Sequence, residues 1–236
     1  MKHHQGFTLI EMAIVLIIIT ILIGGLAVPL SAQIQARRVA ETKKILEEAR
    51  DALYGYAMTH STGIGSRYLP CPDTDGDGRE NRESATQCTE YRGGYPWVDL
   101  GTAAQDAWGN RLRYAVVRNF IDSSGGFTAS SPNPGGFDPL QVCTDRTCTP
   151  PLVADQVIFI LVSHGPNGWG AQNVSGSTLA PPNAADEADN LDSDRFYVSR
   201  PPTQSDNPLG EFDDLLSWSS HAQLIARVCP TGCGAP

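Results

Sequence analysis

The sequence predicts an α+β protein in which a long N-terminal helix, membrane half plus amphipathic half, packs on a small antiparallel β-sheet. Three observations support this prediction: an apolar run over 7–30, a helix-period pattern over 31–62, and short strand-like runs between turn-rich tracts in 63–236. Residues 63–236 are therefore expected to form one globular domain with long irregular loops.

The apolar run GFTLIEMAIVLIIITILIGGLAVPL carries one charged residue, Glu11. As a helix rising ~1.5 Å per residue, Phe7 to Leu30 would reach about 36 Å, enough for a hydrocarbon core of ~30 Å. A carboxylate within a lipid-embedded helix costs roughly 2.5–3.5 kcal/mol, so Glu11 is expected to have a function. Alternatively, Glu11 complements the dipole at the helix start or reaches the headgroups.

A positive partner for Glu11 would arise if the chain were cut after Gly6. Phe7 would then carry an α-ammonium one helical turn before Glu11. At ~4 Å and an effective dielectric of about 20, such a pair attracts by about 4 kcal/mol before desolvation. The amine could belong to the same chain or to a neighbouring chain in an assembly.

The segment Gly6-Phe7-Thr8-Leu9-Ile10-Glu11, followed by the apolar run, resembles the class III signal of type IV prepilins and type II secretion pseudopilins. The resemblance implies a pilin-like fold, a leader over 1–6, cleavage between Gly6 and Phe7 by a prepilin peptidase, and N-methylation of Phe7. It also implies that Glu11 pairs with the Phe7 amine of an adjacent subunit during assembly.

The same resemblance sets the expected location and partners. The chain would cross the inner membrane once through a transmembrane helix, with its C-terminal domain in the periplasm. An inner-membrane assembly platform would then pass it into a periplasmic or cell-surface filament with other pilins or pseudopilins. Two alternatives are an ordinary secretory signal ending near Ala27 and a permanent anchor.

The helical pattern continues past the apolar run. From Ser31 to about His60, apolar residues recur close to the 3.6 period, and Lys43–Glu47 and Lys44–Glu48 are i,i+4 pairs. Ser61-Thr62-Gly63 is expected to end the helix. Strands are expected at Arg111–Phe120, Gln156–Ser163, Arg195–Ser199 and Ala222–Val228.

Three landmarks resemble the globular domain of major pseudopilins, in the same order: DAWGNRLRYAV (106–116), VSHGPNGWG (162–170) and EFDDLLSW (211–218). In that family the last two lie close together in sequence, whereas here about forty residues intervene. The insertion favours a specialised or minor subunit over the plain shaft subunit.

Charge and cysteine content narrow the function classes. The formal net charge is −9, which is unfavourable for general nucleic-acid binding, so no nucleic-acid partner is expected.

The six cysteines form three sequence-local pairs, as expected for disulfides in an oxidising compartment. Six cysteines allow 15 pairings, and the simplest one joins sequence neighbours: Cys71–Cys88, Cys143–Cys148 and Cys229–Cys233. A zinc site is the weaker interpretation because no repeated C-x-x-C occurs.

The segment PCPDTDGDGREN (70–81) indicates a calcium loop. Asp73, Asp75 and Asp77 occupy ligand positions 1, 3 and 5, and Gly78 follows. Asn81 could bind directly or through water, but Ser84 stands where a bidentate Glu is expected. The alternative is a solvated turn rich in Asx hydrogen bonds.

The pseudopilin resemblance implies a second calcium site. It would use the carbonyls of Leu161 and Ser163 with Asp213 and Asp214, although Asn167 replaces an aspartate of the family. A further acidic tract, Asp186 to Asp194, is expected to be a solvated loop.

Catalytic motifs are weak. Ser163-His164 is not a G-x-S-x-G elbow, and the histidines lack H-E-x-x-H spacing. The sequence therefore indicates a non-enzymatic filament subunit, a pseudopilin of a type II secretion system or a minor type IV pilin, with no catalytic residues. The alternatives are a tip adhesin or substrate-binding minor pilin that uses the inserted loops, and a secreted carbohydrate-binding protein.

Overall fold

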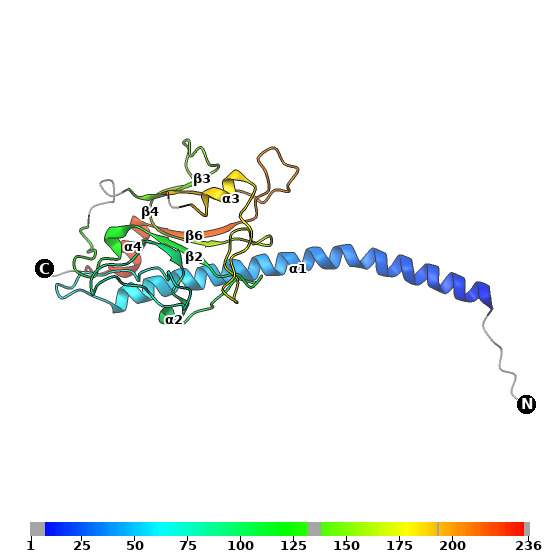
Figure 1. The fold of residues 1–236 in the computed structure, drawn as a ribbon, viewed down its shortest axis with the longest axis horizontal. Coiled ribbons are helices and arrows are strands. Elements are labelled where there is room, and N and C mark those ends of the chain that lie inside the picture. The colour runs from blue at the N-terminus through cyan, green and yellow to red at the C-terminus, as the bar shows by residue number, and fades with distance from the viewer. Residues whose placement is uncertain (1–7, 132–137, 193, 234–236) are drawn as a thin grey trace, which may run out of the picture. The chain divides into compact units, whose positions relative to one another are not determined.

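The computed structural model describes residues 8–131, 138–192 and 194–233. The chain divides into two compact units, residues 1–40 and 41–236, which are described separately. Helix α1 (Leu9–Thr59) begins in the first unit and ends in the second (Figure 1). The expected long N-terminal helix is confirmed, and its last main-chain bond runs from the His60 amide to the Tyr56 carbonyl at 2.9 Å.

In the first unit, the large apolar side chains at the start of α1 are exposed. Between Leu9 and Ile23 their exposed fractions run from 90% for Leu9 to 44% for Ile19. The Thr20 hydroxyl donates to the Leu16 carbonyl at 2.7 Å, so its polar group is satisfied within the helix. A helix that is apolar all round needs lipid or other helices to cover it. Of the described helices, none reaches the length and mean hydropathy required to span a membrane.

The second unit contains one six-stranded sheet with the order β1-β2-β4-β3-β5, to which β6 is added beside β4. Its strands are β1 (Arg92–Gly94), β2 (Arg113–Val116), β3 (Leu140–Cys143), β4 (Ala154–Ser163), β5 (Phe196–Val198) and β6 (Leu215–Ser220). The sheet is mixed, since β3 and β5 are parallel while the other pairs are antiparallel. The expected antiparallel pairing is confirmed for the other strand pairs, and β3–β5 adds one parallel pair. The long connection through β4 and α3 permits a crossover that a hairpin turn does not.

Strand β4 is the centre of the sheet, because it pairs with β2, β3 and β6. Every residue from Val157 to Ser163 is buried. At Gln156 the backbone has φ +53°, and the registers with β3 and β6 shift beside it. This bulge bends β4, so that its first part pairs with β3 and its second part with β2.

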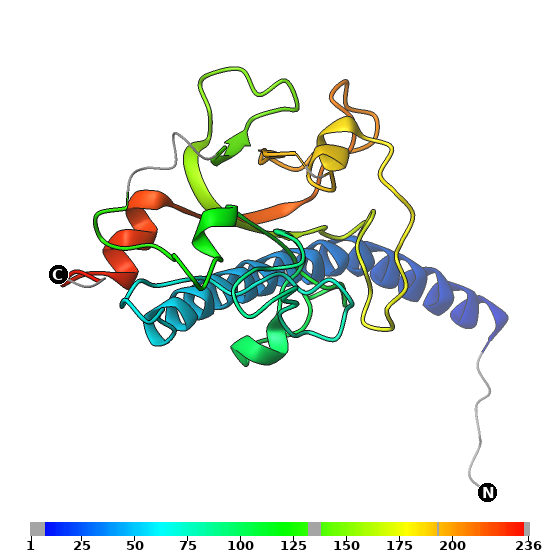
Figure 2. The same cartoon turned by 60° about the vertical axis from the view of Figure 1, so that its left-hand side comes forward.

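The part of α1 that belongs to the second unit packs on the sheet (Figure 2). Leu46 and Leu53 are buried, and the Tyr54 ring meets Phe159 of β4 edge-on at 5.8 Å. The Tyr95 hydroxyl donates to the Ala49 carbonyl at 3.2 Å. The amphipathic pattern of 31–62 thus buries one stripe from about Thr42 onward.

The described residues of the second unit also form four short helices: α2 (Trp97–Leu100), η1 (Arg118–Phe120), α3 (Ala185–Asp189) and α4 (His221–Val228). The expected strand at Ala222–Val228 is wrong, because this segment is α4. A capping box starts the helix: Ser220 accepts the Gln223 amide, and the Gln223 side chain accepts the Ser220 amide. Leu224 and Val228, four residues apart, are buried on one face.

All six cysteines form disulfides, in the sequence-local pairing expected from their spacing. Cys71–Cys88 encloses the acidic loop at 73–77. Cys143–Cys148 follows β3 immediately, and Cys229–Cys233 follows α4.

Candidate functional site

The processing residues Gly6 and Phe7 lie outside the described residues. Glu11 lies in the first turn of α1 and its carboxylate is held locally. Oε2 accepts the Thr8 amide at 2.9 Å and the Thr8 hydroxyl at 2.8 Å, while the Glu11 amide approaches Thr8 Oγ1 at 3.3 Å. This is the reciprocal arrangement of a capping box. In the single chain, Thr8 therefore satisfies the carboxylate at one oxygen only.

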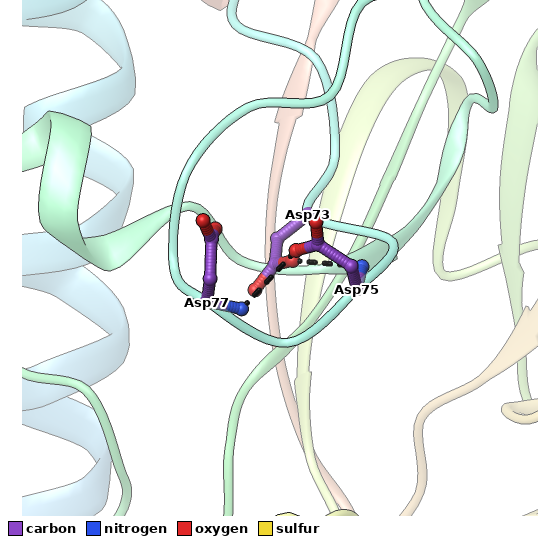
Figure 3. Close-up of side chains that lie close together, drawn as sticks. All are labelled: Asp73, Asp75 and Asp77. Atoms are coloured by element: carbon purple, nitrogen blue, oxygen red, sulfur yellow. Dashed lines mark hydrogen bonds between the residues drawn. The ribbon is translucent and has the colours of Figure 1, made fainter.

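The acidic loop brings Asp73, Asp75 and Asp77 together, with one carboxylate oxygen of each within 4.8 Å of the others (Figure 3). Asp73 is buried and accepts three main-chain amides: Asp75 at 3.1 Å and Gly76 at 2.7 Å on Oδ1, and Gly78 at 2.9 Å on Oδ2. Burial raises the pKa of Asp73, while the amides of Gly76 and Gly78 oppose the rise. Through these three hydrogen bonds, the Asp73 carboxylate holds the turn together.

The other two loop aspartates are exposed. Asp75 accepts the Asp77 amide and the Asn81 side chain, both at 3.3 Å, and the amide of Asp77 lowers its pKa. Asn81 is thus beside the acids, as the loop register predicts. Ser84 is not: its hydroxyl accepts the amides of Thr86 and Gln87 in a separate turn. The loop has the first part of a calcium-binding pattern and lacks the bidentate ligand that normally completes it.

A second acidic cluster consists of Glu187, Asp213 and Asp214, which also approach within 4.8 Å of one another. Glu187 comes from α3, while the aspartates precede β6. Glu187 Oε1 accepts the Asp213 amide and the Asn167 side chain, each at 3.0 Å. The Asp214 oxygens are occupied by His164 Nδ1 at 3.3 Å and Asn190 Nδ2 at 2.8 Å.

This second cluster consists of three acidic side chains and contains no basic one to balance their charge. Burial raises the pKa of Asp213 to about 7, and the charge of Glu187 contributes further. Burial also raises the pKa of Glu187, and Asp214 adds to the effect. Glu187 Oε2 and Asp213 Oδ1 are buried and accept no hydrogen bond in the part of the chain that the structure describes. Two unpartnered oxygens on adjacent carboxylates fit a hard, oxygen-binding cation such as calcium.

The loop after β4 reaches this cluster. The Asn167 amide donates to Asp213 Oδ2 at 3.2 Å, and Gly165 (φ +57°) approaches so closely that a Cβ there would lie 2.3 Å from the Asp213 carbonyl oxygen. Leu161 and Ser163 pair with Ser217 and Leu215 of β6. The fold therefore brings together the segments proposed for the second calcium site, while the Ser163 hydroxyl itself donates to Asp106 at 2.7 Å.

Glu187 is a site residue that the sequence pattern does not single out. The tract from Asp186 to Asp194 was expected to be a solvated loop, yet Asp186 and Glu187 are buried on α3. Asp186 makes a 2.7 Å ion pair with Arg200, which leaves Glu187 as the acid that joins the cluster. The density of acids within the inserted segment was the available signal, but nothing local shows which acid turns inward.

The N-terminal segment matches a known protein family model. Residues 1–27 match the prokaryotic N-terminal methylation motif. The chain is a prepilin-type protein. No curated protein and no solved structure matches it.

The matched segment of this prepilin-type protein contains the Gly6–Phe7 junction and Glu11. It supports a structural subunit of the pilin or pseudopilin type, which is processed by a prepilin peptidase and assembles with other pilins. The α+β fold, with α1 packed on a sheet, agrees with this class.

Proposed function

We propose that the protein is a non-enzymatic subunit of a type IV filament, either a pseudopilin of a type II secretion system or a minor type IV pilin. The observation that carries this proposal is the methylation motif over residues 1–27, with Glu11 set in an exposed apolar helix. Before assembly the chain resides in the inner membrane as a single-pass protein with its C-terminal domain in the periplasm. The assembly platform then transfers it to the filament.

Assembly depends on two features of α1. The exposed side chains between Leu9 and Ile23 leave lipid to pack against other apolar helices, where close packing stabilises the bundle. Among the described residues, Glu11 accepts hydrogen bonds from Thr8 alone, and on Oε2, so Oε1 remains for a cationic amine. The α-ammonium of a neighbour's Phe7, exposed by cleavage after Gly6, supplies that charge and sets the register between subunits.

We also propose that calcium is a structural cofactor, held by Glu187, Asp213 and Asp214 and, at a second site, by Asp73, Asp75 and Asp77. The unpartnered oxygens of Glu187 and Asp213 support the first site most strongly. A bound cation would neutralise the clustered acids and fix α3 against the loop that follows β4. The surface formed by the inserted segment would then be rigid in the assembled filament.

A second candidate function is a tip or substrate-binding role for the inserted segment. The observation that favours it is an open cleft of about 420 Å³, part of whose wall is formed by the chain from Gly170 to Thr178. A subunit that only filled the shaft would not need such a cleft.

The filament proposal is tested on protein recovered from the native host. Mass spectrometry should find N-methylated Phe7 as the first residue, and Glu11→Ala should sharply reduce its recovery in filaments. An intact leader, or undiminished assembly of Glu11→Ala, would contradict the proposal. Immunogold labelling then separates the two roles: label along the filament supports a shaft subunit, and label only at tips supports the binding role.

A further inference from the structure

Three arginines line the cleft that the inserted segment partly encloses. Arg92 lies on β1, Arg113 on β2, and Arg111 two residues before Arg113. The β1–β2 register places Arg92 opposite Ala115 and Gly94 opposite Arg113, so both arginines lie on one face of the sheet. Tyr114 follows Arg113 in β2, so its side chain lies on the other face of the sheet, where it is buried in the core. Three cationic side chains thus gather in one cleft of a chain whose net charge is −9.

These three arginines share one way of being satisfied. Each donates from Nη2 to main-chain carbonyls: Arg92 to Asp194 at 2.5 Å, Arg111 to Val174 at 3.4 Å, and Arg113 to Leu191 at 2.6 Å and Asp192 at 3.2 Å. Within residues 8–131, 138–192 and 194–233, none of the three forms an ion pair with a carboxylate. By contrast, Arg79, Arg82, Arg195, Arg200 and Arg227 each have one.

Donors that need an acceptor collect behind this surface. The Nε atoms of Arg92 and Arg113 are buried without a hydrogen-bond partner among the described residues. Tyr197 is fully buried, and the charges of Arg92 and Arg113 counteract the rise that burial causes in its pKa. Burial lowers the pKa of Arg113, and the positive charge of Arg92 lowers it further. An anion placed between the two guanidinium groups would relieve both their mutual repulsion and their lack of acceptors.

The rest of the cleft limits the kind of anion. Asp73 and Asp75 line it together with Glu90, and Gln172 and Thr178 add neutral polar groups. Carboxylates repel a multiply charged phosphate or a polyanion but accept hydrogen bonds from hydroxyl groups. Arg111 lies over Trp97 at 3.8 Å, so one guanidinium is held flat and directed by its stacking. The cleft therefore combines a site for one carboxylate with acceptors for several hydroxyls.

We propose that this cleft binds a carboxylate-bearing saccharide, with Arg92, Arg111 and Arg113 on the carboxylate and with Glu90, Gln172 and Thr178 on the hydroxyls. This binding belongs to the second unit and does not require filament assembly. Its success or failure is therefore independent of the processing and assembly of the N-terminal helix.

The test is a titration of the full-length protein in detergent, using calorimetry and intrinsic tryptophan fluorescence, to which Trp97 beside Arg111 contributes. The probe is glucuronate, with glucose and inorganic phosphate as controls. Glucuronate should bind, and phosphate and glucose should bind at least tenfold more weakly. Loss of one charge-assisted hydrogen bond corresponds to about a tenfold loss of affinity, so Arg111→Gln should weaken glucuronate binding by about that factor.

Matched variants complete the test. Arg118→Gln removes an equal charge outside the cleft and should bind glucuronate as the unaltered protein does. Arg113→Gln should lose binding more completely than Arg111→Gln, and thermal unfolding will show whether it folds; Arg111→Gln decides the matter if it does not. Absence of glucuronate binding, equal binding of phosphate or glucose, or equal losses in Arg111→Gln and Arg118→Gln would each overturn the proposal.

Discussion

Glu187 Oε1 accepts the main-chain amide of Asp213 at 3.0 Å and thereby fastens the inserted helix α3 to the pair of aspartates before β6. The same carboxylate accepts Asn167 from the loop after β4. Three segments far apart in sequence therefore meet at one side chain, whose second oxygen has no hydrogen-bond partner among the described residues. The calcium proposal depends mainly on this arrangement.

Replacing Glu187 with Gln should separate the roles of its two oxygens. The amide oxygen can still accept Asp213 and Asn167, while the charge and the free oxygen are lost. We expect the rise in melting temperature caused by calcium to shrink strongly, and stability in chelator to stay equal or increase because one buried negative charge is gone. Differential scanning calorimetry with calcium and with chelator measures both. Asp206→Asn, an exposed change in the same inserted region, should alter neither. An unchanged calcium effect in Glu187→Gln would count against the site.

Asp213 should make the calcium-free protein sensitive to pH. Its pKa is about 7 in the folded protein, above the ordinary 3.8. The folded state therefore holds a proton that the unfolded chain releases at lower pH. The stability from this group is fully present below 3.8 and is lost as the pH rises through about 7. Urea denaturation in chelator should show lower stability at about pH 8 than at about pH 5, and Asp213→Asn should reduce the difference. An equally large difference in Asp213→Asn would assign it to other groups.

Asp73 and Asp75 provide an internal comparison in the acidic loop. Asp75→Ala should lower thermal stability in calcium and leave it nearly unchanged in chelator, because its two hydrogen bonds are long and exposed. Asp73→Ala should destabilise the protein in both conditions, by about 1–3 kcal/mol, since it leaves buried amides without an acceptor. Thermal melts of both variants measure this contrast. If Asp75→Ala loses the same stability in calcium and in chelator, the loop is an Asx-rich turn and not a cation site.

Thr8 and Glu11 can be separated in the same way. Thr8→Ala removes the cap of α1, a local loss of about 0.5–2 kcal/mol, but keeps the carboxylate available to a neighbouring amine. Filament recovery should therefore be largely retained in Thr8→Ala and lost in Glu11→Ala. Quantitative blotting of sheared filaments compares the two variants. Equal losses would show that capping of the helix, not charge pairing between subunits, explains the need for Glu11.

Structural features that depend on residues close together in the sequence can be predicted from the sequence alone. The extent of α1, the processing motif around Gly6 and Glu11, and the buried strand at Gln156–Ser163 follow from periodicity and local chemistry. Helix α4 was misassigned although its signal was also local. Ser220 and Gln223 have capping-box spacing, and Leu224 and Val228 have helical spacing, but the apolar residues there also fit a strand.

The sequence by itself determined that this chain is a prepilin-type protein with a long helix, because those signals depend on residues a few positions apart. Only the tertiary structure decided that β3 and β5 pair in parallel, that Glu187 turns inward to Asp213, and that Arg92 and Arg113 share one face of a cleft. Each of these depends on which distant segments become neighbours. Short-range patterns do not encode that choice, because it is set by the packing of the whole domain.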